Sequence, residues 1–306
     1  MSSKAVYILG LPLFALAGCD SLGLSQAFVI DRLRVLGVAA EPAEPRPGDV
    51  VTFTSLVVSP VSPVGLTTWF ACSDLSSCTP DPALLAGLTG DPAAMTPEDL
   101  AAAFAALQEA GMIGVEPYLS PTWTVPTDYL DMLADADKIE GLPALVLVSA
   151  IPTVEGDTAT LATAEADIEI AYKRVPVSLA TTPNHNPVVV ELSIDGVVIA
   201  PGAVVTLVDG QTYAIDLTLS TDSIEEYRFV NKDGLEETRT EEPYFSWYLQ
   251  QGAFDQSNTL WPYTAIEYTA SKDNAAEDAS AEQSLWVVVR DRRGGMAWAE
   301  QRIRVE

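Results

Sequence analysis

The chain has 306 residues, with 43 acidic and 16 basic side chains and a formal net charge of −27. This length allows two domains that each bury a core of their own. Nucleic acids and membranes with anionic headgroups are negatively charged and would repel a chain this acidic. The chain is therefore a poor candidate for binding either. The charge suits a soluble envelope protein or a calcium-rich setting, and solubility is the simpler explanation.

The N-terminus has the layout of an export signal. Lys4 is followed by an apolar run over residues 5–17, too short for a permanent membrane span, and then by Gly18 and Cys19. Residues 16–19, Leu-Ala-Gly-Cys, resemble the lipobox of bacterial lipoproteins, in which the cysteine is lipidated and becomes the new N-terminus. The alternative is a plain secretory signal beside an unmodified cysteine.

The lipobox reading predicts a signal peptide over residues 1–18 and a tether over residues 19–28. Acyl chains such as palmitate on Cys19 would hold the protein on a lipid bilayer, because more than one chain is enough for stable anchoring. We therefore expect a location in the cell envelope, outside the cytoplasm or in the periplasm. The sequence does not choose between the outer and the inner membrane.

Two further cysteines, Cys72 and Cys78, lie close together in the sequence. In an exported protein such a pair favours a disulfide, which would stabilise the fold by roughly 2 kcal/mol. A zinc site is disfavoured, because the chain has one histidine and no second cysteine pair.

A first domain is predicted over residues 29–178. Its strands are expected at residues 30–39, 50–58, 66–71, 142–151 and 164–174. The last of these alternates most clearly, with Ala166, Ile168, Ile170 and Tyr172 on one face and Asp167, Glu169 and Lys173 on the other, which is typical of a half-buried strand.

A helical insertion is expected within this domain, at about residues 82–138. Thr96 and Pro97 form a helix start, an apolar stripe follows, and Gly111 ends the helix. A second short helix is expected from Thr127. The insertion could be a specificity insert or binding flap, but a helical plug over one end of the sandwich is the simpler interpretation.

A proline-rich linker is predicted over residues 179–187 and a second domain over residues 188–306. The second domain should contain about seven short strands, at residues 188–195, 213–219, 226–231, 244–249, 264–269, 285–290 and 296–305. Their spacing, with frequent turn signals, favours an immunoglobulin-like sandwich. The predicted fold class is mainly β, with two such domains and a small helical insertion in the first.

Several short segments resemble exported, immunoglobulin-like lipoproteins of myxobacterial type. Besides the lipobox, they are residues 30–36, the proline-rich segment at residues 41–48, residues 173–178, residues 184–187 and residues 288–295. The resemblance implies a sandwich fold and an envelope location. It implies no activity, since that class has no defined function.

No catalytic group emerges from the sequence. The single histidine, His185, lies in the linker, where we expect it to be solvated rather than held against a nucleophile. Adjacent carboxylates such as Glu241 and Glu242 point to opposite faces of a strand, so they do not form the facing pair of a glycosidase. The chain is therefore predicted not to be an enzyme and to need no cofactor.

Calcium and carbohydrate are the two ligands that the residue types leave open. Weak calcium candidates are Asp233, Asp273 and Asp278, which lie in acidic segments without the spacing of a dedicated calcium loop. Candidate ligand contacts are Trp247, Trp261 and Trp298, the last expected to face outward. Aromatic residues are also normal sandwich core, which is the simpler interpretation.

Three functions follow, in order of preference. The first is a non-enzymatic envelope lipoprotein that presents an interaction surface to an envelope protein or the cell wall. The second is a lectin-like module that binds carbohydrate or another surface. The third is a hydrolase with a site at the helical insertion, which would need two facing carboxylates there.

Overall fold

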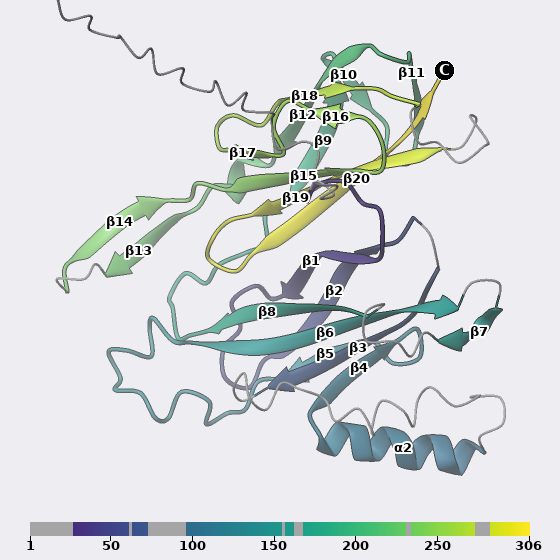
Figure 1. Cartoon of the computed structure of the whole chain (residues 1–306). Coiled ribbons are helices and arrows are strands. Elements are labelled where there is room, and N and C mark those ends of the chain that lie inside the picture. Colours follow the sequence, from purple (N-terminus) through teal and green to yellow (C-terminus); the bar gives the residue numbers. More distant parts are fainter. Residues whose placement is uncertain are drawn as a thin grey trace, which may run out of the picture.

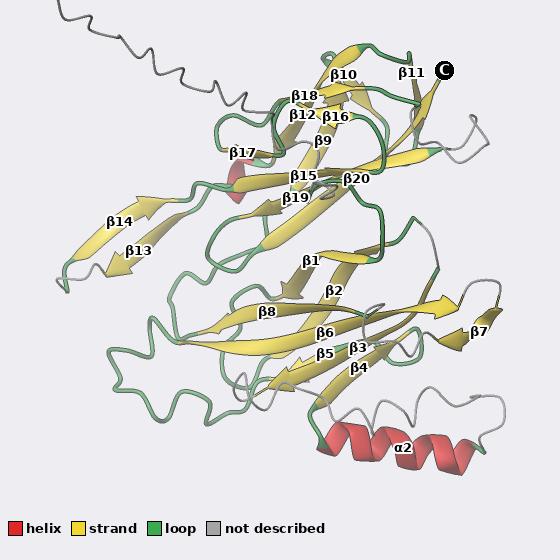
Figure 2. Cartoon of the chain, in the orientation of Figure 1, coloured by secondary structure: helices red, strands yellow, loops and turns green. Residues whose placement is uncertain are grey.

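The computed structural model describes residues 27–60, 63–72, 96–154, 157–161, 168–230, 234–272 and 282–306. Within these ranges strands dominate, and a single α-helix and one short 3-10 helix accompany them (Figure 2). The predicted fold class, mainly β with two sandwich domains and a helix in the first, is confirmed. None of the helices within these ranges has the length and apolar character that crossing a membrane requires.

The first domain is a sandwich of two sheets. One sheet has the order β1 (Arg34–Glu41), β2 (Val50–Val58), β5 (Thr122–Thr124). The other has the order β4 (Met112–Glu116), β3 (Val64–Cys72), β6 (Leu142–Val154), β7 (Asp157–Leu161), with β8 (Glu169–Val177) also paired to β6. Trp69 and Phe53 meet between the sheets, with ring centroids 5.8 Å apart. β6 is the central strand of this sheet, since it pairs with β3, β7 and β8.

Helix α2 (Pro97–Glu109) covers the outer face of the second sheet, on the side away from the second domain (Figure 1). Its bounds confirm the helix predicted between Thr96 and Gly111. Leu107 is buried from the helix against Phe70 and Leu147 of the sheet. The helix therefore adds a third layer to this domain.

The second predicted helix, from Thr127, is wrong. This segment forms successive turns, with hydrogen bonds from Tyr129 N to Pro126 O and from Leu133 N to Leu130 O. These three-residue spacings close turns rather than a continuous helix, and the chain between them places Leu130 in the domain core. The insertion also contributes two strands that were not predicted, β4 and β5.

The predicted face of β8 is also wrong. Ile170 and Tyr172 are exposed, whereas Lys173, Val175 and Val177 are buried. The strand does alternate, but its inner face is the one that carries the lysine. Val175 and Val177 on this face pack in the core of the first domain, and the second domain supplies the partner for Lys173.

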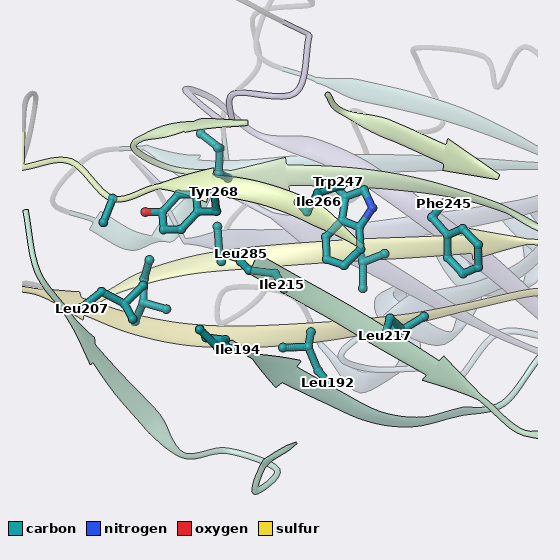
Figure 3. Packing of buried hydrophobic residues seen from close by; sticks show 14 of the residues in the cluster. Leu192, Ile194, Leu207, Ile215, Leu217, Phe245, Trp247, Ile266, Tyr268 and Leu285 are labelled. Carbon is teal, nitrogen blue, oxygen red and sulfur yellow. The ribbon is translucent and has the colours of Figure 1, made fainter. Parts of the chain in front are cut away.

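The second domain pairs two five-stranded sheets. One has the order β10 (Val197–Ile199), β9 (Val189–Ile194), β12 (Thr212–Leu219), β18 (Ile266–Thr269), β16 (Ala253–Phe254). The other has the order β11 (Val204–Leu207), β20 (Met296–Val305), β19 (Gln283–Arg290), β15 (Tyr244–Leu249), β17 (Asn258–Leu260), and β11 runs parallel to β20. Figure 3 shows Phe245, Trp247 and Tyr268 packed with aliphatic side chains in this core.

A hairpin of β13 (Glu226–Val230) and β14 (Glu236–Thr240) extends from the body of the second domain (Figure 1). Its second strand is exposed throughout. Arg239 lies over the Phe229 ring, with the guanidinium carbon 3.5 Å from the ring centroid. The sequence predicted β13 but not β14, so the hairpin itself was not foreseen.

The chain contacts the second domain before it enters the first. Ile30 N donates to Leu249 O at 2.7 Å, and Leu249 N donates to Phe28 O at 3.0 Å. Phe28 and Val29 also pack against the core of the second domain. The last part of the predicted tether, residues 27–28, is therefore bound to β15 and belongs to the folded body.

The two domains share an apolar interface. Trp286 and Val288 on the outer face of β19 are buried against Ile30, Leu36 and Val58. The other face of β19 lies in the core of its own sandwich, so this strand is buried on both sides. The continuous apolar packing joins the two sandwiches into one unit.

Candidate binding site at the domain junction

The turn between β19 and β20, residues 291–295, is the centre of the junction. Oδ1 of the buried Asp291 accepts the backbone N–H groups of Arg293 at 2.7 Å and of Gly294 and Gly295 at 2.9 Å each. Its Oδ2 accepts from Nδ2 of the buried Asn184 at 2.8 Å. Burial raises the pKa of Asp291, and these hydrogen bonds oppose that rise.

The linker is fastened to both domains. Nδ2 of Asn186 donates to Ala40 O at 2.7 Å in the first domain, and Oδ1 of Asn186 accepts from Met296 N at 2.9 Å in the second. His185 Nδ1 lies 2.7 Å from Oε1 of Glu225, while most of its ring is exposed. The expected exposure of His185 is thus present, and Glu225 is the one polar partner of its ring within the described residues.

Arg293 gathers three carboxylates beneath the turn. Its Nη1 lies 2.9 Å from Glu241 and 3.0 Å from Glu225, and its Nη2 lies 3.5 Å from Glu44 of the first domain. The Glu241 side chain is 1% exposed. Burial, with the negative charge of Asp291, raises the pKa of Glu241 to about 7 despite Arg293.

Lys173 reaches the same turn from the first domain. Its Nζ donates to Gly294 O, and the side chain is almost fully buried. Burial lowers the pKa of Lys173 to about 8, although Asp291 favours the charged form. This contact satisfies the lysine on the inner face of β8, the face that Val175 and Val177 bury in the first domain.

All the described segments that carry the lipoprotein resemblance meet here. Leu36 O accepts from Nη2 of Arg290 at 2.8 Å, and Glu44 receives Arg293. The segments at residues 173–178 and 184–187 supply Lys173 and the two linker asparagines. Residues scattered through the sequence thus build one junction.

Two adjoining hollows open beside the turn, and both are lined by Tyr244 and Arg292. The first, here called the cationic hollow, has a volume of about 420 Å³. Its charged lining residues are all basic: Lys173, Arg174, Arg290, Arg292 and Arg293. Five of the chain's 16 basic residues therefore line one hollow of a strongly acidic protein.

The second, here called the aromatic hollow, has a volume of about 1010 Å³. Tyr263 on its lining is 78% exposed. Polar side chains complete the lining: Asp216, Gln256, Asn258, Thr259 and Thr264. The pairing of Tyr244 with Leu260 and the hydrogen bond from Tyr263 N to Leu260 O at 2.7 Å position the aromatic side of this hollow.

The structure separates the three candidate tryptophans. Trp247 is 1% exposed in the sandwich core, so its prediction as a ligand contact is wrong. Trp298 does lie on the outer face of its strand, but the first domain covers it: a Cβ on Gly37 would lie 3.2 Å from its ring. Trp261 is half-buried and lines a third hollow of about 650 Å³ with Glu242 and Arg292, so its role stays a prediction.

Several predicted site residues lie outside the described residues: Cys19, Cys78, Asp233, Asp273 and Asp278. Cys72 ends β3 and is half-buried, so its predicted disulfide with Cys78 stays a prediction. No group of three or more histidine, cysteine or acidic side chains in the described ranges could hold a metal ion. The calcium candidates lie outside these ranges and stay predictions.

Sequence reasoning paired Tyr263 with Trp261 as a candidate for sugar stacking, but it did not single out Tyr244, Arg174 or Arg292. The one local signal was the Arg-Arg pair in the 291–295 turn of a chain poor in basic residues. Arg292 adopts a φ of +71°, a left-handed conformation that is uncommon for a residue with a side chain. Such positions are enriched at functional sites, but the sequence alone does not reveal them.

No protein-family model and no curated protein matches the chain. A solved nucleoside hydrolase-related hypothetical protein from Saccharophagus degradans, associated with carbohydrate metabolism, is 15% identical with a TM-score of 0.26, over 40% of this chain and 26% of that one. A 1.5-MDa bacterial ice-binding adhesin is 9% identical with a TM-score of 0.23, over 90% of this chain and 66% of that one. Murine CEACAM1b is 11% identical with a TM-score of 0.22, over 88% and 100%. The chain spans less than two thirds of the first two, and likeness at these scores carries no argument about function.

Proposed function

We propose that this protein is a lipid-anchored, non-enzymatic binding module of the cell envelope. The observation that carries the binding role is the contrast at the junction between buried and exposed groups. The buried ionisable groups Lys173, Glu241 and Asp291 hold the turn through hydrogen bonds and ion pairs. Arg174, Arg292 and Tyr263 are instead exposed to solvent in open hollows. The lipobox-like residues 16–19 support the proposed anchoring to a membrane.

The buried groups argue for structure rather than catalysis. Strongly shifted pKa values are frequent in active sites; Glu241 and Lys173 have them, and burial also raises the pKa of Asp291. A catalytic acid or base must reach the substrate directly or through one water. These three side chains border hollows, but they are almost fully buried. Their polar atoms are engaged by Arg293, the backbone of the turn and Asn184.

The anchor proposed at Cys19 would place the second domain next to the bilayer. Phe28 is bound to the second domain through Leu249. The nine steps from Cys19 to Phe28 span at most about 32 Å of extended chain. The first domain, with helix α2 on its far side (Figure 1), would then project away from the membrane.

The experiment compares the wild type with Cys19→Ala in cells fed an alkyne analogue of palmitate. We expect the wild type to carry the label and to sediment with membranes, and the variant to lose both properties. The double variant Cys72→Ala, Cys78→Ala is the matched control, since it removes the other cysteines and should keep the label. Equal labelling and sedimentation of Cys19→Ala would overturn the anchor.

The proposed disulfide between Cys72 and Cys78 has a separate test. Thiol alkylation of the exported protein before and after reduction, followed by mass spectrometry, should show two thiols that become reactive only after reduction. The pair would stabilise the fold by roughly 2 kcal/mol. Alkylation of both cysteines without reduction would contradict this part of the proposal.

A carbohydrate ligand is the second candidate, and the aromatic hollow favours it. An exposed tyrosine ring beside amide and hydroxyl side chains, here Tyr263 with Asn258 and Thr264, can pack on the apolar face of a sugar while the polar groups contact its hydroxyls.

A further inference from the structure

We propose that the cationic and aromatic hollows together form one groove for an acidic oligosaccharide. The carboxylates of the ligand would contact Arg174 and Arg292, and a sugar ring would pack on Tyr263. This inference rests on the binding function proposed above and names its ligand. The two hollows count as one groove because Tyr244 and Arg292 line both.

The partners of the five basic side chains show which are available to a ligand. Arg293 is occupied by three carboxylates, Lys173 donates to Gly294 O, and Arg290 donates to Leu36 O and to Ser246 Oγ. These three cations hold the junction together. The charge of Arg293 is compensated by its three carboxylates, so the contacts to a ligand fall to the other two arginines.

Arg292 and Arg174 are the available cations. Arg292 is half-exposed, lies 3.8 Å from an exposed Glu242 and is 5.9 Å from the Tyr244 ring centroid. Arg174 is exposed on β8, and no polar side chain or carbonyl in the described part of the chain pairs with it. A guanidinium presents two parallel N–H groups to a carboxylate, so each arginine can bind one acidic group in a bidentate manner.

The net charge of −27 does not prevent this binding. At physiological ionic strength, charges more than about 8 Å apart are largely screened. A ligand in the cationic hollow would lie within this distance of the exposed guanidinium groups of Arg174 and Arg292, so these two charges govern the last step of binding. The acidic remainder of the surface would instead discourage polyanions that do not fit the groove.

The aromatic hollow favours a saccharide over a simple anion as the ligand. It continues from Arg292 to Tyr263 and carries hydroxyl and amide side chains and one carboxylate, Asp216, which accepts a hydrogen bond from Thr264 Oγ1. It has no further cation among the described residues of its lining. A phosphate or a free carboxylate would leave this larger hollow without contacts. A chain of sugar rings that bears carboxylates matches both parts, because its rings need apolar faces and hydrogen bonds and its acids need the arginines.

The test uses the full-length protein, purified from whichever cell fraction holds it, on a panel of immobilised oligosaccharides that contain uronic, muramic or sialic acids. Each member is paired with a copy in which the carboxylates are converted to methyl esters. We expect binding to at least one acidic member, at least about tenfold weaker binding to its ester, and weakening by added salt.

Variants assign the contacts. Arg292→Gln should weaken binding of the acidic ligand at least about tenfold and remove the preference over the ester. Arg174→Gln should have the same effect in direction, and Tyr263→Ala should weaken the acid and the ester alike. Arg304→Gln, an exposed arginine paired with Glu282, is the matched control and should bind as the wild type does.

Three results would overturn the inference: no acidic member is bound, the esters bind equally well, or Arg292→Gln binds normally. Binding to phosphate-bearing glycans without any carboxylate would also overturn it. The protein is purified from the cell fraction in which it is found. These binding results therefore do not depend on whether Cys19 is lipidated. Loss of the anchor with retained glycan binding, or the reverse, separates the two proposals.

Discussion

Arg293 Nη1 lies 2.9 Å from Glu241 Oε1, and this pair joins the β19–β20 turn to the base of the β13–β14 hairpin. The same guanidinium reaches Glu44 of the first domain at 3.5 Å. One side chain thereby connects the two domains and the hairpin. The three carboxylates that contact Arg293 are mostly buried, so the guanidinium is the cation that compensates their negative charge.

Replacing Arg293 by methionine should lower the free energy of unfolding by about 3–5 kcal/mol, because it leaves buried carboxylates without their cation. Urea unfolding at pH 7 measures the change. The matched control is Arg304→Met, which removes an exposed pair with Glu282 and should change the free energy by less than about 1 kcal/mol. Equal effects of the two substitutions would contradict the structural role assigned to Arg293.

The raised pKa of Glu241 makes stability depend on pH. Between its ordinary value of 4.5 and about 7 the folded protein holds a proton on Glu241 that the unfolded chain has released. The free energy of unfolding should therefore fall as pH rises through this window. Glu241→Gln removes this contribution, so the difference between wild type and variant should change between pH 4.5 and 7 and be constant above it. A difference that is flat across the window would show that Glu241 titrates normally.

Lys173 has the opposite dependence in a different window. Its lowered pKa means that the folded protein sheds a proton near pH 8, while the unfolded chain keeps it up to about pH 10.5. The free energy of unfolding should rise with pH between these values. Urea unfolding of the wild type and Lys173→Met at pH 8, 9 and 10 tests this, since the variant should lack the rise. If the free energy of unfolding rises equally with pH in both proteins, the pKa of Lys173 is not lowered in the folded state.

The apolar interface should make the two domains unfold together. Trp286 is buried between them, and its replacement by alanine should cost about 3–5 kcal/mol. We expect calorimetry to show one transition for the wild type and two for Trp286→Ala. Leu107→Ala, a cavity under helix α2 in the first domain alone, is the control and should keep a single transition at a lower temperature. Two transitions in the wild type would show that the interface does not couple the domains.

Strands whose inner face is covered by their own sandwich were predicted from the sequence. β2, β15 and β20 have the predicted bounds, and β12 buries Ile215, Leu217 and Leu219 in the expected alternation. In each of these strands one face of alternating apolar residues meets the core of its own domain. Local periodicity therefore carries the information that places them.

The parts that the sequence did not reveal depend on contacts between distant segments. Lys173 faces inward because Gly294 of the other domain receives its ammonium, and Trp298 is covered because Gly37 allows β1 to approach it. The groove has the same origin, since Arg174 and Arg292 belong to different domains. The residue pattern of a single strand does not show which residues of the other domain will contact it.

Gly295 offers the sharpest test of the junction geometry. Its φ is not in the left-handed region, so the requirement for glycine is one of space alone. A Cβ there would lie 2.0 Å from Asp291 Oδ2 and 2.7 Å from His185 O. This clash would push the Asp291 carboxylate away from the backbone N–H groups that donate hydrogen bonds to it. Gly295→Ala should therefore destabilise the protein by more than about 2 kcal/mol, the cost of leaving a buried polar group unsatisfied. Gly210→Ala is the contrasting control, because Gly210 has a φ of +73° but open space around it, and strain alone should cost about 1 kcal/mol. If urea unfolding shows the smaller loss for Gly295→Ala, the close approach of Asp291, the linker and the turn is not what holds the domains together.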